Sequence, residues 1–369
     1  MFNSIFKRVT SSGNYIAEID GFRFLAIFLV IIFHSNIWSD ELYGINKSYL
    51  WKIIDMGNIG VQFFFCISGF IIAMPFIKNY SLNRKVKISS YFIRRLTRLE
   101  PPYLIAMLGF YTIAIFLSSH SFGELLHHYL TTIFYSHGFI FDSRSLINSV
   151  SWSLEIEIQF YIIAPILFLI FKIKSKKLII ILLTIISVFW PLLFNTIGFN
   201  YLNLLGYFHY FTFGSLLCFL YLNYKISPSY IYDFLGVILF FMIFTLFNYK
   251  QFFVNYFLGL TIFLIYLFVL NSKLIIKFFR LDIISTIGGM CYTIYLVHNP
   301  LLQYVKKFQL AYFSTNNFYI DSINAFIILI PLLTVCCGIF YLLVEKPFML
   351  SKRESILNYY RAFFRINYK

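Results

Sequence analysis

The chain has 369 residues, of which 60% are hydrophobic and only 12% are charged, and its mean hydropathy is +0.78. Soluble domains are about 45–50% apolar and about 25% charged, so this composition excludes an ordinary water-soluble protein. The 30 Lys and Arg residues outnumber the 15 Asp and Glu residues. In a membrane protein, an excess of basic residues first indicates which loops lie on the cytoplasmic side. We therefore expect a multi-pass protein in a lipid bilayer, with no nucleic-acid partner.

Apolar windows of span length recur along the whole chain, and each is close to the ~20 residues that a transmembrane helix needs. They cover residues 20–38, 57–77, 101–118, 155–171, 178–195, 203–222, 232–247, 251–270, 283–303 and 324–344. The sequence therefore predicts an all-α bundle of about ten transmembrane helices. It forms one membrane-embedded domain over residues 1–369, with no separate soluble domain.

The distribution of basic residues predicts the orientation of this bundle. Most of the 30 Lys and Arg residues lie in the N-terminal segment, in alternate loops and in the C-terminal tail. The loops of the other side hold only Lys47, Lys52, Arg144, Lys250, Lys306 and Lys307. By the positive-inside rule both termini are predicted to be cytoplasmic, in an inner (cytoplasmic) membrane. No small-residue cleavage site follows the first window, so we expect that window to be retained as a span.

The first span carries two ionisable residues, Arg23 and His34, although each such residue costs roughly 2.5–3.5 kcal/mol inside a membrane. Eleven helical steps turn by about 1100°, some 20° beyond three full turns, and rise about 16 Å. The two side chains therefore share one face at two depths, with Arg23 nearer the cytoplasm. Taken singly, each is also explained as a snorkelling Arg or an interfacial His; the shared stripe favours a functional site.

Two arginines stand three residues apart in the loop predicted between the second and third spans. On a short helix Arg95 and Arg98 project from the same side. Guanidinium groups in that arrangement bind polyanions through charge-assisted, bidentate hydrogen bonds. A topology anchor would use the same residues, so the pattern alone leaves both interpretations open.

The second and fourth spans carry small and polar residues at helical spacing. Gly60 and Gly69 permit close approach of a neighbouring helix. Ser153, Glu157 and Tyr161 recur every four residues and form one polar stripe. Glu157 lies deep enough to need a partner, for which Arg23 is a candidate. It is either a functional group or half of a structural ion pair.

The ninth span and the chain end supply the remaining candidates. Tyr295 and His298 are three residues apart and can face the same cavity, although a His before an Asn-Pro pair is also typical of an interface. The last span ends at the helix stop Glu345-Lys346-Pro347. His127 and His128 are adjacent and lack metal-type spacing with carboxylates, so no metal site is predicted.

Taken in order, these segments resemble the acyltransferase-3 family of integral-membrane acyltransferases, best known for O-acetylating bacterial surface polysaccharides. The resemblance covers nearly the whole chain, and the shared order and spacing of its motifs are fairly specific. The motifs are Arg23-x10-His34, Gly60 to Gly69, Arg95-Leu96-Thr97-Arg98, Trp152-Ser153-Leu154 leading to Glu157, Gln159-Phe160-Tyr161 and Pro165, Tyr292 to His298, and Glu345-Lys346-Pro347.

The chain departs from the family pattern in two ways. A second carboxylate often follows the position of Glu157 in related chains, but here that position is Ile158 and an acid stands earlier, at Glu155. Some larger relatives also carry a C-terminal extracytoplasmic hydrolase-like domain. We expect this chain to be the stand-alone form, because it ends about 25 residues after its last predicted span.

The resemblance implies an acyl-CoA donor, usually acetyl-CoA, that arrives from the cytoplasm. The acceptor is a sugar hydroxyl of a surface or lipid-linked polysaccharide, reached from the other side. Arg95 and Arg98 are suited to the phosphates of coenzyme A. No metal is implied.

The resemblance also suggests roles for the deeper residues. His34 is assigned as general base, because an imidazole can take the proton of an attacking hydroxyl. Arg23 holds the donor or stabilises developing negative charge, and Glu157 is a candidate for orienting His34. Tyr295, His298 and Trp152 are assigned to the acceptor side or to support of the reacting groups.

Three alternatives stay open at this point. The acyl group can pass directly to the sugar or first to the protein, with His34 as nucleophile. A polytopic transporter of a glycan or organic anion would also place His, Arg and Glu within its spans, and paired broken helices would favour it. A glycan polymerase or ligase would be expected to carry a larger outer loop rich in Arg and His. The acceptor and the acyl group are not readable from the pattern.

Overall fold

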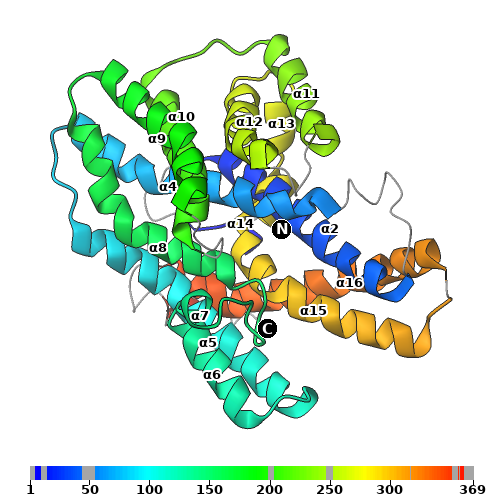
Figure 1. The fold of residues 1–369 in the computed structure, drawn as a ribbon. Coiled ribbons are helices and arrows are strands. Elements are labelled where there is room, and N and C mark those ends of the chain that lie inside the picture. Colours follow the sequence, from blue (N-terminus) through cyan, green and yellow to red (C-terminus); the bar gives the residue numbers. More distant parts are fainter. Residues whose placement is uncertain are drawn as a thin grey trace.

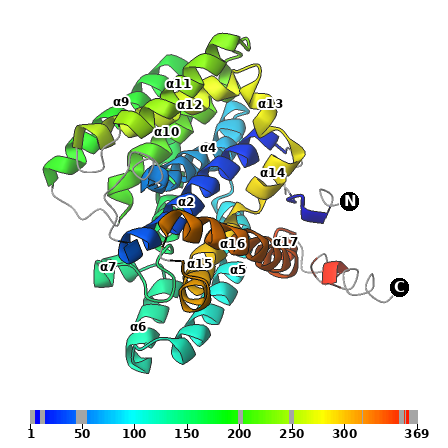
Figure 2. The ribbon, with the colours of Figure 1, turned by 90° about the vertical axis from the view of Figure 1, so that its right-hand side faces the viewer.

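The computed structural model describes residues 5–9, 15–43, 55–197, 203–246, 252–315, 317–350, 356 and 358–360, and over these ranges every regular element is helical. The helices are packed around α4 and α2, and the hairpin of α5 and α6 projects from one end (Figures 1 and 2). The main elements are α2 (Ala17–Tyr43), α4 (Gly60–Ser81), α5 (Ile88–Leu117), α6 (Phe122–Ile133), α7 (His137–Phe141), α8 (Trp152–Leu167), α9 (Lys176–Ile197), α10 (Leu204–Asn223), α11 (Tyr230–Leu246), α12 (Phe252–Leu270), α13 (Ile275–Phe279), α14 (Asp282–Gly289), α15 (Cys291–Tyr312), α16 (Phe318–Phe340) and α17 (Lys346–Phe348).

Several of these helices have the length and composition of membrane spans. Within the described ranges six helical stretches are long and apolar enough to cross a bilayer. They are Met56–Ser81, Ile88–Leu117, Trp152–Lys172, Lys176–Phe194, Leu204–Asn223 and Phe326–Phe348. The protein is therefore an all-helical, multi-pass membrane protein. The count of about ten spans and the cytoplasmic side of both termini stay predictions.

Two helices differ from the windows read in the sequence. Helix α5 begins at Ile88 and runs without interruption through Pro101 and Pro102, so the segment expected to be a loop is helical. The ninth window is instead broken at Met290, where α14 ends and α15 begins. Local sequence signals favour a boundary at a Pro pair, but packing of α5 against its neighbours keeps the helix continuous.

Glycines set the closest helix contacts of the core, as predicted for Gly60 and Gly69. A Cβ atom added at Gly69 would lie 2.1 Å from the carbonyl oxygen of Phe211 on α10, and one at Gly214 would lie 1.9 Å from that of Cys66 on α4. At Gly60 the nearest atom is the carbonyl oxygen of Ala26 on α2, at 2.5 Å. Helix α4 is therefore held against α10 and α2 at backbone contact.

The two ends of the described chain meet at a π-helical segment, Tyr341–Glu345, that follows α16. The ring of Phe6 stacks on Tyr341 with centroids 6.3 Å apart. From the other end, the hydroxyl groups of Tyr359 and Tyr360 donate to the carbonyl oxygens of Leu342 and Leu343 at 3.0 and 2.6 Å. Both ends consequently lie on the same side of the bundle (Figure 2).

We predict that Gly69→Ala destabilises the protein, because the added methyl group forces α4 and α10 apart. The expected loss of unfolding free energy is about 1–3 kcal/mol, measured by thermal unfolding of the purified protein in detergent. Gly109→Ala is the matched control, since nothing lies within 4 Å of a Cβ atom there. It should leave stability unchanged or raise it by about 0.5–1 kcal/mol. Equal stability of the two variants would contradict the close contact.

Candidate functional site

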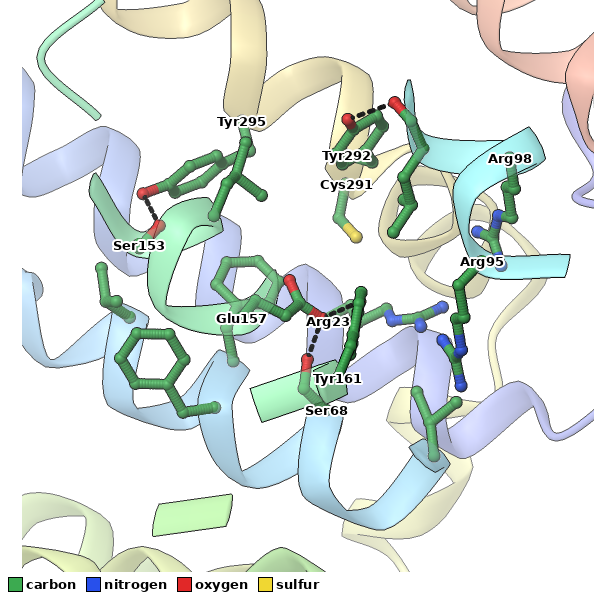
Figure 3. Close-up of a pocket in the computed structure, with 16 residues that line it drawn as sticks. Arg23, Ser68, Arg95, Arg98, Ser153, Glu157, Tyr161, Cys291, Tyr292 and Tyr295 are labelled. Carbon is green, nitrogen blue, oxygen red and sulfur yellow. Dashed lines mark hydrogen bonds between the residues drawn. The ribbon is translucent and has the colours of Figure 1, made fainter. Parts of the chain in front are cut away.

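Helices α2, α4, α5, α8 and α15 surround a pocket of about 90 Å³ (Figure 3). At one end lie the side chains of Arg23, Arg95 and Arg98. Tyr295 and Ser153 lie at the other end, and Glu157 stands between them (Figure 3). The pocket thus has a cationic end and an end lined by hydroxyl groups.

The Glu157 carboxylate is held by two hydroxyl donors. Ser68 donates to its Oε1 atom at 2.7 Å and Tyr161 donates to the same atom at 2.5 Å. Ser153, Glu157 and Tyr161 all line the pocket, so the polar stripe predicted on this helix is confirmed. The suggested partner Arg23 lines the same pocket, but its ion pair is formed with Asp20 instead.

Asp20 is the centre of a buried charge cluster at the start of α2, and only 2% of its surface is exposed. Its Oδ1 atom accepts from Arg23 at 2.6 Å and from Arg8 at 2.9 Å. Burial, together with the neighbouring cations Arg23 and Arg98, lowers the pKa of Arg8 to about 9, although Asp20 acts to raise it. Arg8 thus adds positive charge behind the cationic end of the pocket.

Arg95 and Arg98 reach the pocket from the first half of α5. The guanidinium carbon of Arg95 lies 5.4 Å from the centre of the Tyr161 ring, a cation–π contact. The buried Nε atom of Arg98 has no hydrogen-bond partner in the described part of the chain. Arg94, which immediately precedes Arg95 in the sequence, is exposed and does not line the pocket.

A pair of histidines lies beside the hydroxyl-lined end. The Tyr295 hydroxyl donates to the Val150 carbonyl at 3.0 Å and lies 2.6 Å from the Ser153 hydroxyl. The Tyr295 ring centre is 5.6 Å from that of His298, which is fully buried. His298 in turn meets His34, with Nε2 of the former 3.4 Å from Nδ1 of the latter.

Five of the eight predicted site residues line the pocket, namely Arg23, Arg95, Arg98, Glu157 and Tyr295. His34 and His298 do not line it but contact each other next to Tyr295. Trp152 packs on Phe65, which does line the pocket, with ring centres 6.4 Å apart. Arg23 lines the pocket together with Cys291 and Tyr292 of α15, and His34 meets His298 of the same helix. Both therefore lie on the side of α2 that faces α15, as their spacing predicts.

Sequence reasoning assigned no role to Asp20, Ser68, Cys291 or Tyr292. Asp20 stands three residues before Arg23 on the same helix, and an acid and a base at that spacing are a readable signal of an ion pair. The other three have no such local signal in the sequence. Ser68, for example, acts through Glu157, which is 89 residues away in sequence.

The outer helices α6 and α7 contain a second histidine pair, away from the pocket. His128 Nδ1 lies 2.7 Å from His137 Nε2, and both side chains are buried. Burial and the neighbouring His128 lower the pKa of His137 to about 4. Among the described residues, no three His, Cys, Asp or Glu side chains are grouped as metal ligands would be.

Fold and pocket together define a class: a multi-pass helical membrane protein with a buried pocket that presents three arginines, a carboxylate and several hydroxyl groups. The chain belongs to the family described as "Acyltransferase domain", whose model matches residues 16–342. The resemblance inferred from the motifs is therefore confirmed.

Several curated relatives come from Staphylococcus aureus. The chain is 27% identical over 386 residues to "Putative O-acetyltransferase SACOL0978" of strain COL, which covers 93% of this chain and 58% of that protein. It is also 27% identical over 380 residues to "O-acetyltransferase OatA" of strain NCTC 8325, which covers 93% of this chain and 59% of that protein. The chain thus spans less than two thirds of the length of these relatives. No solved structure matches it.

We predict that Asp20→Ala strongly destabilises the protein, because it leaves the Arg23 and Arg8 guanidinium groups without their shared carboxylate. Breaking a buried pair in this way costs about 3–5 kcal/mol, which thermal unfolding in detergent measures. Glu18→Ala is the control on the same helix. It breaks a pair whose Arg280 side chain is 55% exposed, so about 0–1 kcal/mol is expected. Similar losses in both variants would contradict the central position of Asp20.

Proposed function

We propose that the protein is a membrane O-acyltransferase that moves an acyl group, acetyl by default, from cytoplasmic acyl-CoA to a sugar hydroxyl of a surface or lipid-linked polysaccharide. The observation that carries the proposal is the division of one pocket into an arginine end and a hydroxyl-lined end with His298 and His34 beside it. Membership of the acyltransferase family supports it. So do the names of the S. aureus relatives.

The arginine end is suited to the phosphates of coenzyme A. Arg23, Arg95 and Arg98 bring three guanidinium groups together, and planar guanidinium groups bind phosphate oxygens bidentately. The unpartnered Nε–H of Arg98 is a buried donor that a phosphate oxygen would satisfy. Along α2, Arg23 and His34 are separated by a rise of about 16 Å, comparable to an extended pantetheine arm. A donor held at the arginines therefore directs its thioester towards the histidines.

Glu157 supports the donor site through its hydrogen-bond partner. Its carboxylate fixes the Tyr161 hydroxyl, and the Tyr161 ring faces the Arg95 guanidinium. The carboxylate also offsets part of the positive charge of the arginine end. We therefore assign Glu157 to the reacting pocket rather than to contact with His34.

Local hydrogen bonding sets the tautomer that His34 needs as a general base. Its Nδ1 atom lies 2.9 Å from the Val30 carbonyl oxygen, so Nδ1 carries the proton and Nε2 is the basic atom. The Nδ1 atom of His298 faces the carbonyl oxygens of Ile294 and Tyr295, at 3.1 and 2.8 Å. His298 is protonated there in the same way, and its Nε2 atom is an acceptor for the His34 Nδ1–H group.

In the proposed reaction the sugar hydroxyl attacks the thioester carbonyl while His34 Nε2 takes its proton. Arg23, about 16 Å away along α2, holds the phosphate end of the donor together with Arg95 and Arg98. The carbon–sulfur bond then breaks, and the departing thiolate takes the proton back from His34. The products are the acetylated sugar and free coenzyme A.

The acceptor is proposed to enter from the extracytoplasmic side, past Tyr295, His298 and Trp152. This arrangement requires the inner-membrane location and the cytoplasmic termini that the basic residues predict. It also treats residues 1–369 as one membrane-embedded acyltransferase domain.

Transport of a glycan or organic anion is the second candidate, because the break at Met290 places a helix start beside the pocket. Unlike acyl transfer, transport leaves no new ester on the glycan. The two functions are therefore distinguished by the chemistry of the cell surface.

We predict that His34→Ala abolishes ester formation, because it removes the group proposed to take the hydroxyl proton. A deletion strain is complemented with each variant at matched membrane levels, and base-labile esters on surface polysaccharide are measured by NMR. His127→Ala, an exposed histidine on α6, is the control and should restore wild-type ester levels. Full restoration by His34→Ala would remove His34 as the base. Esters unchanged by the deletion itself would argue against acyl transfer to this polymer.

We predict that the double variant Arg95→Ala and Arg98→Ala raises the KM for acetyl-CoA, because two phosphate-binding groups are lost. Loss of two charge-assisted contacts of about 1.5 kcal/mol each corresponds to roughly a 100-fold increase. The measurement is acetyl transfer in isolated membranes as a function of acetyl-CoA concentration. Arg94→Ala, on the same helix but exposed, should leave KM unchanged. An unchanged KM in the double variant would reduce Arg95 and Arg98 to topology anchors.

A further inference from the structure

Glu345 is a buried acid that does not line the pocket. It contacts α15, one of the helices that surround the pocket. It ends the π-helical segment Tyr341–Glu345 and is 1% exposed. Its Oε2 atom accepts from the Thr293 backbone N–H at 3.1 Å and from the Thr293 hydroxyl at 2.6 Å. Short π-helical turns are rare and occur frequently at functional sites.

The position of Thr293 explains what these two bonds do. It lies in the first turn of α15, where backbone N–H groups have no partner within the helix. A carboxylate there satisfies a free donor and interacts favourably with the helix dipole. Because α14 ends at Gly289 and α15 begins at Cys291, the N–H groups of this first turn are not bonded within one continuous helix. Glu345 satisfies one of them from outside α15.

The residues on either side of Thr293 on α15 reach both halves of the proposed site. Tyr292 donates to the carbonyl oxygen of Leu99, next to Arg98 on α5, at 2.8 Å. Tyr295 forms the hydroxyl-lined end of the pocket, and His298 contacts His34. A rotation or shift of the α15 start would therefore move Tyr295 and His298 together.

We propose that Glu345 is a positioning residue for acyl transfer, which caps α15 through Thr293 and thereby sets Tyr295 and His298 against His34. This inference rests on the proposed function. Glu345 lies outside the pocket lining, and the Tyr292 bond still ties the start of α15 to Leu99, so its loss should change kcat rather than the KM for acetyl-CoA. A purely structural role, such as anchoring the chain ends at Tyr341, would not produce that separation.

The test uses full-length protein in membranes at matched levels, with [14C]acetyl-CoA as donor. The readout is base-labile label in the polysaccharide fraction, compared with the deletion strain. Glu345→Ala should lower kcat roughly 100-fold, the scale of a misplaced reacting group, with KM unchanged. Glu345→Gln should retain most of the activity, because its amide oxygen accepts the same two bonds.

Thr293→Val provides a matched change on the other partner. It removes the hydroxyl bond and keeps the backbone bond, so roughly a tenfold loss of kcat is expected. Added to Glu345→Ala, it should cause no further loss, because both variants break the same contact. If Glu345→Ala does not reach the membrane, the other two variants test the proposal. A lower kcat in Thr293→Val together with a nearly unchanged kcat in Glu345→Gln supports the cap, and any other combination contradicts it.

The outcomes separate this inference from the proposed function. With an active wild type, wild-type kcat in Glu345→Ala, additive losses in the double variant, or equal losses in the Gln and Ala variants would each overturn the cap. Absence of label with wild-type protein would instead overturn the proposed function. In that case the modification rate of Cys291 by a small methanethiosulfonate, followed by peptide mass spectrometry, still tests the inference. The rate should change in Glu345→Ala and not in Glu345→Gln, and identical rates in all three proteins would overturn it.

Discussion

Asp20 is the residue on which the site depends, because its carboxylate holds Arg23 at the pocket and its backbone lies against α14. Its Oδ1 atom binds both Arg23 and Arg8. At the same point a Cβ atom on Gly288 would lie 1.7 Å from the Asp20 carbonyl oxygen. Helix α14 therefore packs at backbone contact on the residue that orients Arg23. Since α14 ends one residue later, this contact also determines where α15 starts.

Helix α15 connects the two parts of the proposed chemistry. Its first turn is bonded to Leu99 on α5 and to Glu345, and its next turns carry Tyr295 and His298. The proposed donor binding at the arginines and the proposed proton transfer at His34 are placed at two depths of α2. Because α15 is one helix packed beside α2, it fixes the distance between the arginines and the histidines. The Tyr292 bond to Leu99 further ties that helix to the segment of α5 that bears Arg95 and Arg98.

The charges of the site are arranged so that an anionic ligand completes them. Arg23, Arg95 and Arg98 face the pocket, whereas Asp20 lies behind Arg23 and Glu157 is bonded by two hydroxyl groups. Uncompensated positive charge in a region of low dielectric is costly. A polyphosphate donor would relieve that cost on binding. Under the proposed function, this excess of positive charge favours an anionic donor over a neutral one.

The sequence by itself determined the features that depend on local periodicity. Composition and window length gave the helical membrane class, and motif order gave the family. Helical spacing placed Arg23 and His34 on one face, Ser153, Glu157 and Tyr161 in one stripe, and Gly60 and Gly69 at close contacts. Each of these statements concerns residues on one helix, whose relative directions follow from 100° per residue.

Only the tertiary structure decided how those faces meet. It placed Arg95 and Arg98 on a continuous helix instead of a loop, gave Glu157 the partners Ser68 and Tyr161, and broke the ninth window at Met290. It also joined His34 to His298, which are 264 residues apart in sequence. Contacts between helices arise from the packing of whole surfaces against one another. No local pattern in the sequence encodes which surfaces those are.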